Sequence, residues 1–221
     1  MLAALMIVIG ACAYAAPLAT FEPGKSKGID IVSCEDGQWA PRTALGREAV
    51  TPKEVTTPPS GYLYFTLTAE VREKLGSDVY LVVDFLDEDI GPVGIGYNTS
   101  KDPYTLGPAY SLLATGGWQR ALVHLADAKL AGLQNGGSDF RFSGPGSMVI
   151  ARVEVYSENP NIEIPSDKER MMKNTRNTLS HDRTWPIQRI DASTTSHALG
   201  GLYPFSMRVP PEKSNAFYVR T

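Results

Sequence analysis

The chain has 221 residues, a formal net charge of −3, sixteen prolines and twenty glycines. This length can bury a substantial core and holds one domain, or one domain and part of a second. The near-neutral charge, without a basic stripe interleaved with aromatic residues, argues against nucleic acid as a partner.

The first sixteen residues differ from the rest of the chain. Leu2 to Ile9 is an unbroken apolar run, and small residues including Ala13-Tyr14-Ala15 follow it. This pattern is typical of a secretory signal peptide over residues 1–16, and the run falls short of the roughly 20 residues that cross a bilayer. We expect a secreted or periplasmic protein without a membrane span. The alternatives are a lipid anchor on Cys12, since Ile9-Gly10-Ala11-Cys12 matches a bacterial lipobox, and an N-terminal strand or buried helix.

Cys34 is the only cysteine beyond this segment. No disulfide framework can therefore hold the domain together, so apolar packing must stabilise the core. A lone thiol on a strand is most often a small buried side chain. The three histidines lie far apart and lack zinc-ligand spacing, which argues against a zinc site.

Alternating apolar residues predict short strands from residue 28 onward. In the run from Tyr62 to Thr68, the residues at 63, 65 and 67 are apolar and should face inward, while Tyr62, Tyr64 and Thr66 face outward. Residues 79–86 are apolar on both parities, as in a central strand covered on both faces. The expected strands are 28–33, 62–68, 79–86, 93–97, 109–113, 118–125 and 148–156.

Three connections between these strands have their own signals. Residues 38–59 are rich in proline, threonine and charge, which predicts a long irregular crossover with one short edge strand at most. Residues 69–75 predict one or two helical turns. Asn135-Gly136-Gly137 tolerates positive φ and predicts a tight reversal before a last strand whose alternate residues 149, 151, 153 and 155 share one face. About eight short strands separated by turns indicate an antiparallel two-sheet sandwich.

The order of these segments resembles a known family. A central strand ends in an acidic turn (residues 84–89), a Gly-Gly-Trp strand follows, then Asp127-Ala128, Asn135-Gly-Gly-Ser-Asp-Phe-Arg and a valine-rich strand. Over residues 28–157 this resembles the galactose-binding-like jelly-roll modules attached to bacterial carbohydrate-active enzymes. The resemblance implies an all-β, two-sheet antiparallel jelly-roll sandwich over residues 17–157, with an irregular C-terminal extension.

The composition changes after Tyr156. Residues 158–180 predict a linker and a short helix, because Ser166 and Glu169 have the spacing of a capping box. Residues 181–221 predict either the truncated start of a further β domain or an edge-strand extension of the sandwich. Tyr203-Pro-Phe-Ser-Met-Arg-Val-Pro-Pro-Glu-Lys within them resembles the opening of the accessory β-sandwich in glycosidases of the β-L-arabinofuranosidase type.

Paired carboxylates lie in predicted turns, where solvated acids are common and calcium is the alternative. The resemblance implies that a structural calcium, where present, lies where the first and last strands meet. It therefore favours Glu35, Asp36 and Glu154 as metal ligands.

Sugar recognition requires an aromatic platform beside planar polar groups, because the C–H faces of a sugar stack on a ring and its hydroxyls bond to carboxylate, amide or guanidinium groups. An ion pair between Asp139 and Arg141 is the structural alternative for those two residues, and Trp118 is expected to be packed or to lie at a rim. The residues expected in loops that fit this chemistry are Trp39, Tyr97, Asn98, Asp102, Tyr104, Asn135, Asp139 and Arg141.

Three functions follow from these patterns. The leading hypothesis is a non-catalytic, monomeric carbohydrate-binding module at the N-terminus of a secreted polysaccharide-degrading enzyme, with a polysaccharide or oligosaccharide as partner. The alternatives are a structural or adhesive β-sandwich without a glycan site, and a glycoside hydrolase fragment, which would need two facing carboxylates.

Overall fold

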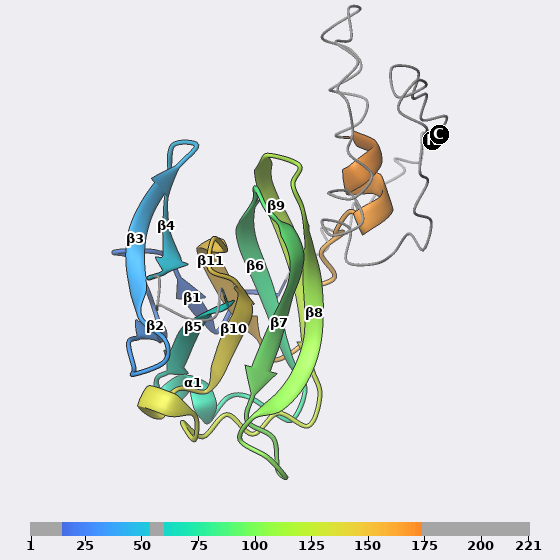
Figure 1. Ribbon diagram of the computed structural model, residues 1–221. Coiled ribbons are helices and arrows are strands. Elements are labelled where there is room, and N and C mark those ends of the chain that lie inside the picture. The colour runs from blue at the N-terminus through green and yellow to red at the C-terminus, as the bar shows by residue number, and fades with distance from the viewer. Residues whose placement is uncertain (1–14, 54–59, 174–221) are drawn as a thin grey trace, which may run out of the picture.

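The computed structural model describes residues 15–53 and 60–173, which form two antiparallel sheets packed face to face (Figure 1). Sheet A has the strand order β3-β4-β11-β6-β9, with β1 also paired to β11, and sheet B has the order β2-β5-β10-β7-β8. Sheet A contains β1 (Ala19–Phe21), β3 (Trp39–Ala44), β4 (Arg47–Pro52), β6 (Val79–Asp87), β9 (Gly117–Leu125) and β11 (Val149–Tyr156). Sheet B contains β2 (Ile29–Val32), β5 (Ser60–Leu67), β7 (Ile90–Tyr97), β8 (Thr105–Leu113) and β10 (Phe140–Pro145).

The chain crosses repeatedly between the two sheets, as in a jelly roll. From β4 to β7 each strand lies in the sheet opposite to the one before it, and the same is true from β8 to β11. The predicted fold class, an all-β antiparallel sandwich, is thus confirmed. Two short helical elements, α1 (Ala69–Arg72) and the 3-10 turn η1 (Asn135–Gly137), lie at one end of the sandwich.

The core consists of the inward residues of both sheets. Leu63, Phe65 and Leu67 of β5 are buried in it, as their alternation predicts. The Phe65 ring stacks on Phe140 at 5.6 Å between centroids and meets Phe142 edge-on, also at 5.6 Å. Burying each such ring contributes roughly 2–3 kcal/mol of transfer free energy, so these rings fix the inward face of β5 and β10. The opposite faces of the same strands therefore point outward.

Residues 38–52 differ from the expected crossover. They form the β3–β4 hairpin, whose turn residues Leu45 and Gly46 both have positive φ, 45° and 75°. Two consecutive left-handed residues match the right-handed twist of a hairpin, but a leucine at the first of them hides that signal in the sequence. Residues 54–59 of the expected crossover lie outside the described residues.

The last strand also departs from its sequence pattern. A register shift between Ile150 and Arg152 inserts one extra residue into β11 opposite β6. Ile150, Val153 and Val155 consequently face the main core, whereas Val149 and Ala151 join a second apolar cluster. The single face predicted for residues 149, 151, 153 and 155 was wrong, because a bulge reverses the alternation.

The segment after β11 packs against the end of the sandwich. Residues 167–173 are helical, and the predicted capping box is present, since the Ser166 hydroxyl lies 2.6 Å from Glu169 Oε2 and accepts the Glu169 amide at 3.3 Å. Arg170 is 6% exposed, and its Nη2 bonds to the carboxylate of the fully buried Asp87 at 2.9 Å. The helix is therefore anchored by a buried ion pair rather than held on a free linker.

Several predictions fall on residues outside those described. These are most of the signal peptide, with its alternative lipid anchor on Cys12, and everything assigned to residues 174–221. Among the helices that the structure does describe, none has the length and apolar character to cross a membrane.

Candidate functional site

Tyrosine side chains gather around one arginine on the outer face of sheet B. Tyr62 and Tyr64 of β5 point away from the core, and Arg141 of β10 is paired directly with Tyr64 across the strands. Tyr104, just before β8, completes the group. The Arg141 guanidinium carbon lies 4.6 Å from the Tyr62 ring centroid, 5.7 Å from that of Tyr64 and 5.2 Å from that of Tyr104. These four residues are called the tyrosine face below.

Four hydrogen bonds and one cation–π contact link Arg141, Tyr64 and Tyr104 with Asp36 and Asn135 in a closed circuit. Arg141 Nη1 donates to the Tyr64 hydroxyl at 2.8 Å, and that hydroxyl donates to Asp36 Oδ2 at 3.0 Å. Asn135 Nδ2 donates to Asp36 Oδ1 at 2.9 Å, while the Tyr104 hydroxyl donates to Asn135 Oδ1 at 2.7 Å. The Tyr104 ring then returns the circuit to Arg141. The side chains of this circuit are thereby held in fixed orientations before any ligand arrives.

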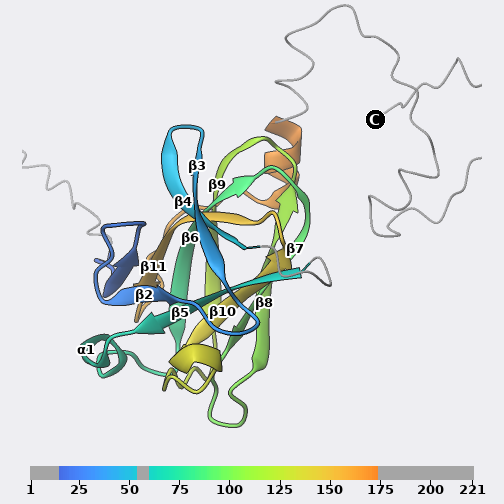
Figure 2. The same cartoon turned by 60° about the vertical axis from the view of Figure 1, so that its left-hand side comes forward.

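The circuit joins segments that are distant in sequence. Asp36 belongs to the connection between β2 and β3, and Asn135 opens η1; both views show these segments side by side at one end of sheet B (Figures 1 and 2). The side chain of Gly37 is absent by necessity, since an added Cβ would lie 2.4 Å from the Tyr64 ring. Glycine at this position lets the loop close over Tyr64, which is fully buried.

The environment fixes the charge state of the circuit. Burial, together with the neighbouring Asp36, raises the pKa of Tyr64 to about 12 despite Arg141, so its hydroxyl keeps its proton. Burial opposes ionisation of Asp36, but hydrogen bonds from Asn135, Cys34 and Tyr64 outweigh it and lower the pKa of that carboxyl. At neutral pH Asp36 is thus a carboxylate and Tyr64 a neutral phenol. Burial and Asp36 also raise the pKa of the Cys34 thiol to about 11, which keeps it protonated and unreactive.

Small residues lie next to the tyrosine face. The row across the outer surface beside Arg141 runs from Tyr62 through Ser143 and Gly94 to Ala109. A Cβ added to Gly94 would find its nearest neighbour, a backbone oxygen, 3.9 Å away, so the space above this glycine is open. An added Cβ on Gly96, by contrast, would lie 3.2 Å from Arg141 Nε, because the arginine side chain lies across that residue. The tyrosine face thus borders a row of small residues, Ser143, Gly94 and Ala109, which is called the strip below.

Three of the predicted sugar-binding residues, Tyr104, Asn135 and Arg141, meet in this circuit. Tyr104 is 37% exposed, and Asp102, another predicted residue, accepts its backbone amide at 2.7 Å and so shapes the turn that presents the ring. Asp36, predicted as a metal ligand, also belongs to the circuit. The alternation placed Tyr62 and Tyr64 on the outer face but gave no reason to select them, because their partner Arg141 lies more than 70 residues away.

Four other predicted residues lie outside the circuit, three of them buried and Trp39 half-buried. Tyr97 is the last residue of β7 rather than a loop residue, is 5% exposed, and donates its hydroxyl to the Ala126 carbonyl. Trp39 begins β3 and packs against the main core. Asn98 is fully buried, and its Nδ2 donates to the Pro103 carbonyl, so its side chain is engaged within the fold.

Asp139 is the fourth, and it does not pair with Arg141. It is fully buried, and its Oδ2 accepts the Leu67 amide at 2.7 Å and Arg72 Nη2 at 2.9 Å, while its Oδ1 accepts the Gly132 amide. The residue precedes β10 and turns inward to hold three backbone segments together. Asp139 and Arg141 are two residues apart, but Asp139 points into the fold whereas Arg141 lies on the outer face of sheet B.

The three predicted calcium ligands do not converge. Glu154 lies where β1 and β11 pair, but it accepts Arg152 Nη2 at 2.7 Å and the Tyr156 hydroxyl at 3.0 Å. Asp36 is engaged on the face of sheet B, and Glu35 is exposed in the loop before it. Within residues 15–53 and 60–173 no three His, Cys, Asp or Glu side chains form a metal-binding group. Calcium binding stays a sequence prediction that these contacts do not support.

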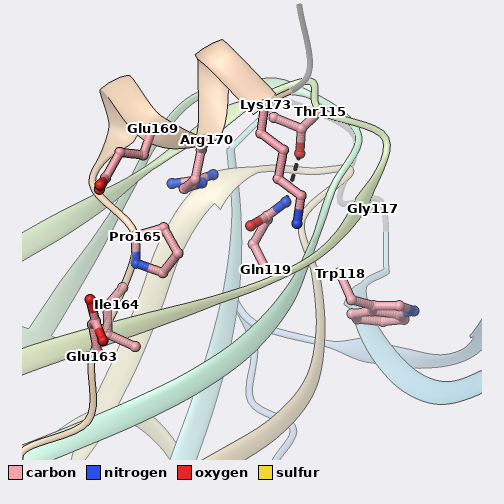
Figure 3. Close-up of a pocket in the computed structure, with 10 residues that line it drawn as sticks. All are labelled: Thr115, Gly117, Trp118, Gln119, Glu163, Ile164, Pro165, Glu169, Arg170 and Lys173. Carbon is pink, nitrogen blue, oxygen red and sulfur yellow. Dashed lines mark hydrogen bonds between the residues drawn. The ribbon is translucent and has the colours of Figure 1, made fainter. Parts of the chain in front are cut away.

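A groove lies elsewhere, between β9 and the segment after β11 (Figure 3). Trp118 borders it, but its ring is directed away from the Lys173 and Gln119 end, lies 4.7 Å from the Arg47 guanidinium and packs on the second apolar cluster. Arg170, on the opposite wall, is committed to Asp87. The groove thus lies where the helix of residues 167–173, called the C-terminal helix below, packs against β9. Trp118, which is already stacked, is the aromatic residue in its lining.

No family model and no curated protein matches the chain. Among solved structures, it is similar to the carbohydrate-binding module CBM6cm-2 of Cellvibrio mixtus lichenase 5A in complex with cellotriose, at 12% identity and a TM-score of 0.40, over 65% of this chain and 100% of the module. It is also similar to the apo form of BiXyn10A CBM1 (8% identity, TM-score 0.39, 65% and 100% covered). A CBM28 module specific for non-crystalline cellulose gives 17% identity and a TM-score of 0.32, with 63% and 87% covered. These values describe distant likenesses in fold, and a function has to be argued from the chain's own geometry.

Proposed function

We propose that this chain is a non-catalytic carbohydrate-binding module that binds a polysaccharide on its tyrosine face. The observation that carries the proposal is the preorganised group of three tyrosines and one arginine beside a strip of glycine, serine and alanine. The rings of Tyr62 and Tyr104 offer faces for the C–H groups of a sugar, whereas the fully buried Tyr64 orients Arg141. The fixed planar side chains bond the sugar hydroxyls. A flat strip suits an extended chain better than a small, enclosed ligand.

The state of the buried acids supports a binding role over a hydrolytic one. Asp84 is bonded to Arg47 and Arg120, Asp87 to Arg170, and Asp139 to Arg72. A glycosidase needs one carboxyl that holds a proton at neutral pH and a second that faces it across the sugar. These three carboxylates already accept hydrogen bonds from arginine side chains, so they stabilise the fold instead.

We further propose that the module is part of a larger, exported protein. We place the module at the front of a secreted or periplasmic polysaccharide-degrading enzyme, in keeping with the apolar run and A-x-A site at residues 1–16. In such an enzyme a weak module keeps the catalytic domain near an insoluble substrate. One or two stacked rings at about 1 kcal/mol each fit an affinity in the micromolar to millimolar range.

Affinity electrophoresis in gels containing plant cell-wall polysaccharides tests the proposal. We expect at least one polysaccharide to retard the wild-type chain, and Tyr62→Ala and Tyr104→Ala each to lower the affinity roughly fivefold, the equivalent of about 1 kcal/mol. Tyr80→Ala is the matched control, because Tyr80 lies on the outer face of sheet A, stacked on His124. If Tyr80→Ala abolishes retardation while the other two variants bind normally, or if no polysaccharide retards the wild type, the tyrosine face is not a glycan site.

A further inference from the structure

Arg141 differs from the other arginines that the structure describes. Six of the seven form an ion pair with a carboxylate, and Arg141 forms none. Its only hydrogen bond within the described residues is the one from Nη1 to the neutral Tyr64 hydroxyl, and its Nε is buried without an acceptor. The six paired arginines are Arg42, Arg47, Arg72, Arg120, Arg152 and Arg170.

Asp36, the carboxylate of the circuit, does not form an ion pair with Arg141. The Tyr64 hydroxyl lies between Asp36 and the guanidinium, and both Asp36 oxygens already accept hydrogen bonds, from Tyr64 on one side and from Asn135 and Cys34 on the other. Asp36 therefore fixes Tyr64 rather than neutralising Arg141. The Arg141 guanidinium lies among tyrosine rings without a carboxylate partner in the described part of the chain, and its planar fork matches a carboxylate better than it matches sugar hydroxyls.

We infer that the glycan bound on the tyrosine face is acidic, and that a uronate carboxylate of the polysaccharide pairs with Arg141. This inference rests on the proposed function and adds the substrate class. The sugar ring beyond the carboxylate then lies over the neighbouring strip, where Gly94 leaves open space and Tyr62 borders it. An ionic contact with one carboxylate adds salt-sensitive affinity and selects uronate polymers over neutral ones of the same shape.

A pair of polymers that differ only at the carboxyl group tests the inference. Polygalacturonate is compared with the same polymer after its carboxyl groups have been reduced to primary alcohols, using the 221-residue chain and isothermal titration at low and moderate salt. We expect the wild type to bind the acidic polymer about tenfold more tightly, as one charge-assisted bidentate contact provides, with a preference that shrinks as salt is added.

Variants at Arg141 separate this inference from the proposed function. Arg141→Gln should lose the preference for the acidic polymer, and Arg141→Lys, which keeps the charge without the fork, should retain part of it. Arg42→Gln, which removes a paired guanidinium, is the control and should keep the full preference. Thermal unfolding confirms that each variant is folded.

Two results would overturn the inference in different ways. If the wild type binds both polymers equally and Arg141→Gln weakens both equally, the face binds glycan but does not read a carboxylate. If the wild type binds neither polymer nor any other cell-wall glycan, the proposed function fails and the inference fails with it.

Discussion

The two outer faces of the sandwich both carry arginine side chains, but the arginines have different partners on the two faces. On sheet A, Asp84 lies between Arg47 and Arg120 at 2.9 and 2.6 Å, and the Arg47 guanidinium covers the Trp118 ring. On sheet B the arginine lies among three tyrosines and has no carboxylate of its own. Charges that cancel within the fold stabilise it, whereas a charge left without a counterion is available to a ligand. The pairing of an arginine, more than its mere presence, separates a structural face from a binding face.

Arg170 is the most deeply buried of the paired arginines, and its replacement should have the largest effect on stability. Arg170→Met leaves the fully buried Asp87 with an uncompensated charge, which costs about 3–5 kcal/mol in the free energy of unfolding. Urea unfolding monitored by circular dichroism measures the change, with the exposed pair Arg42–Glu88 as the control: Arg42→Met should cost less than about 1 kcal/mol. Equal effects of the two variants would mean that the C-terminal helix does not dock through Arg170.

Asp84 provides the next largest effect, together with a pH signature. Burial opposes the charge of Asp84, but hydrogen bonds from Arg120 and Arg47 outweigh it and lower its pKa. Asp84→Asn should reduce stability by about 1–3 kcal/mol at pH 7, because two guanidinium groups lose a charged acceptor and the amide NH2 replaces one of its two oxygens.

The sign of the pH dependence follows from the direction of this shift. A carboxyl whose pKa is lower in the folded protein stabilises it fully above its unfolded-state pKa, about 3.9, and loses that contribution as the pH falls through the folded-state value. The stability difference between wild type and Asp84→Asn should therefore be constant from pH 7 to about pH 5 and shrink below about pH 4. A difference that grows on acidification would contradict the pairing.

A smaller effect, confined to binding, is expected at Gly94. Gly94→Leu fills the open strip beside the tyrosines, so glycan affinity should fall at least tenfold, about 1.4 kcal/mol. Its stability should change little, since a Cβ added at this residue meets no close neighbour and the position faces outward in a strand. Gly76→Leu, also in open space but in the loop after α1, is the matched control and should bind normally. Unchanged affinity in Gly94→Leu would remove the strip from the site.

The sequence predicted the fold better than the site. Alternation assigned both faces of β5 correctly, because that strand is regular and half-buried. It failed on β11, where a bulge changes the register, and on the β3–β4 hairpin, whose turn carries leucine at a left-handed position. Local patterns cannot show such features, since tertiary packing decides them.

The site was predicted in part for a related reason. Tyr104, Asn135 and Arg141 were selected for their chemistry, and they do meet. Tyr97 and Asp139 were selected for the same chemistry, but the fold buries both of them. Whether an arginine finds a carboxylate depends on contacts between residues that are distant in sequence, such as Arg170 and Asp87, which are 83 residues apart, and no spacing rule reveals that.

A nuclear magnetic resonance titration with an oligogalacturonide tests the central claim most directly. The claim predicts that the largest shifts fall on the backbone amides of Tyr62, Gly94, Gly96 and Tyr104 and on the Nε–H resonance of Arg141, and that they saturate together. Shifts centred on Trp118, Gln119 and Lys173 would instead place the ligand in the groove of Figure 3 and contradict the assignment of the tyrosine face.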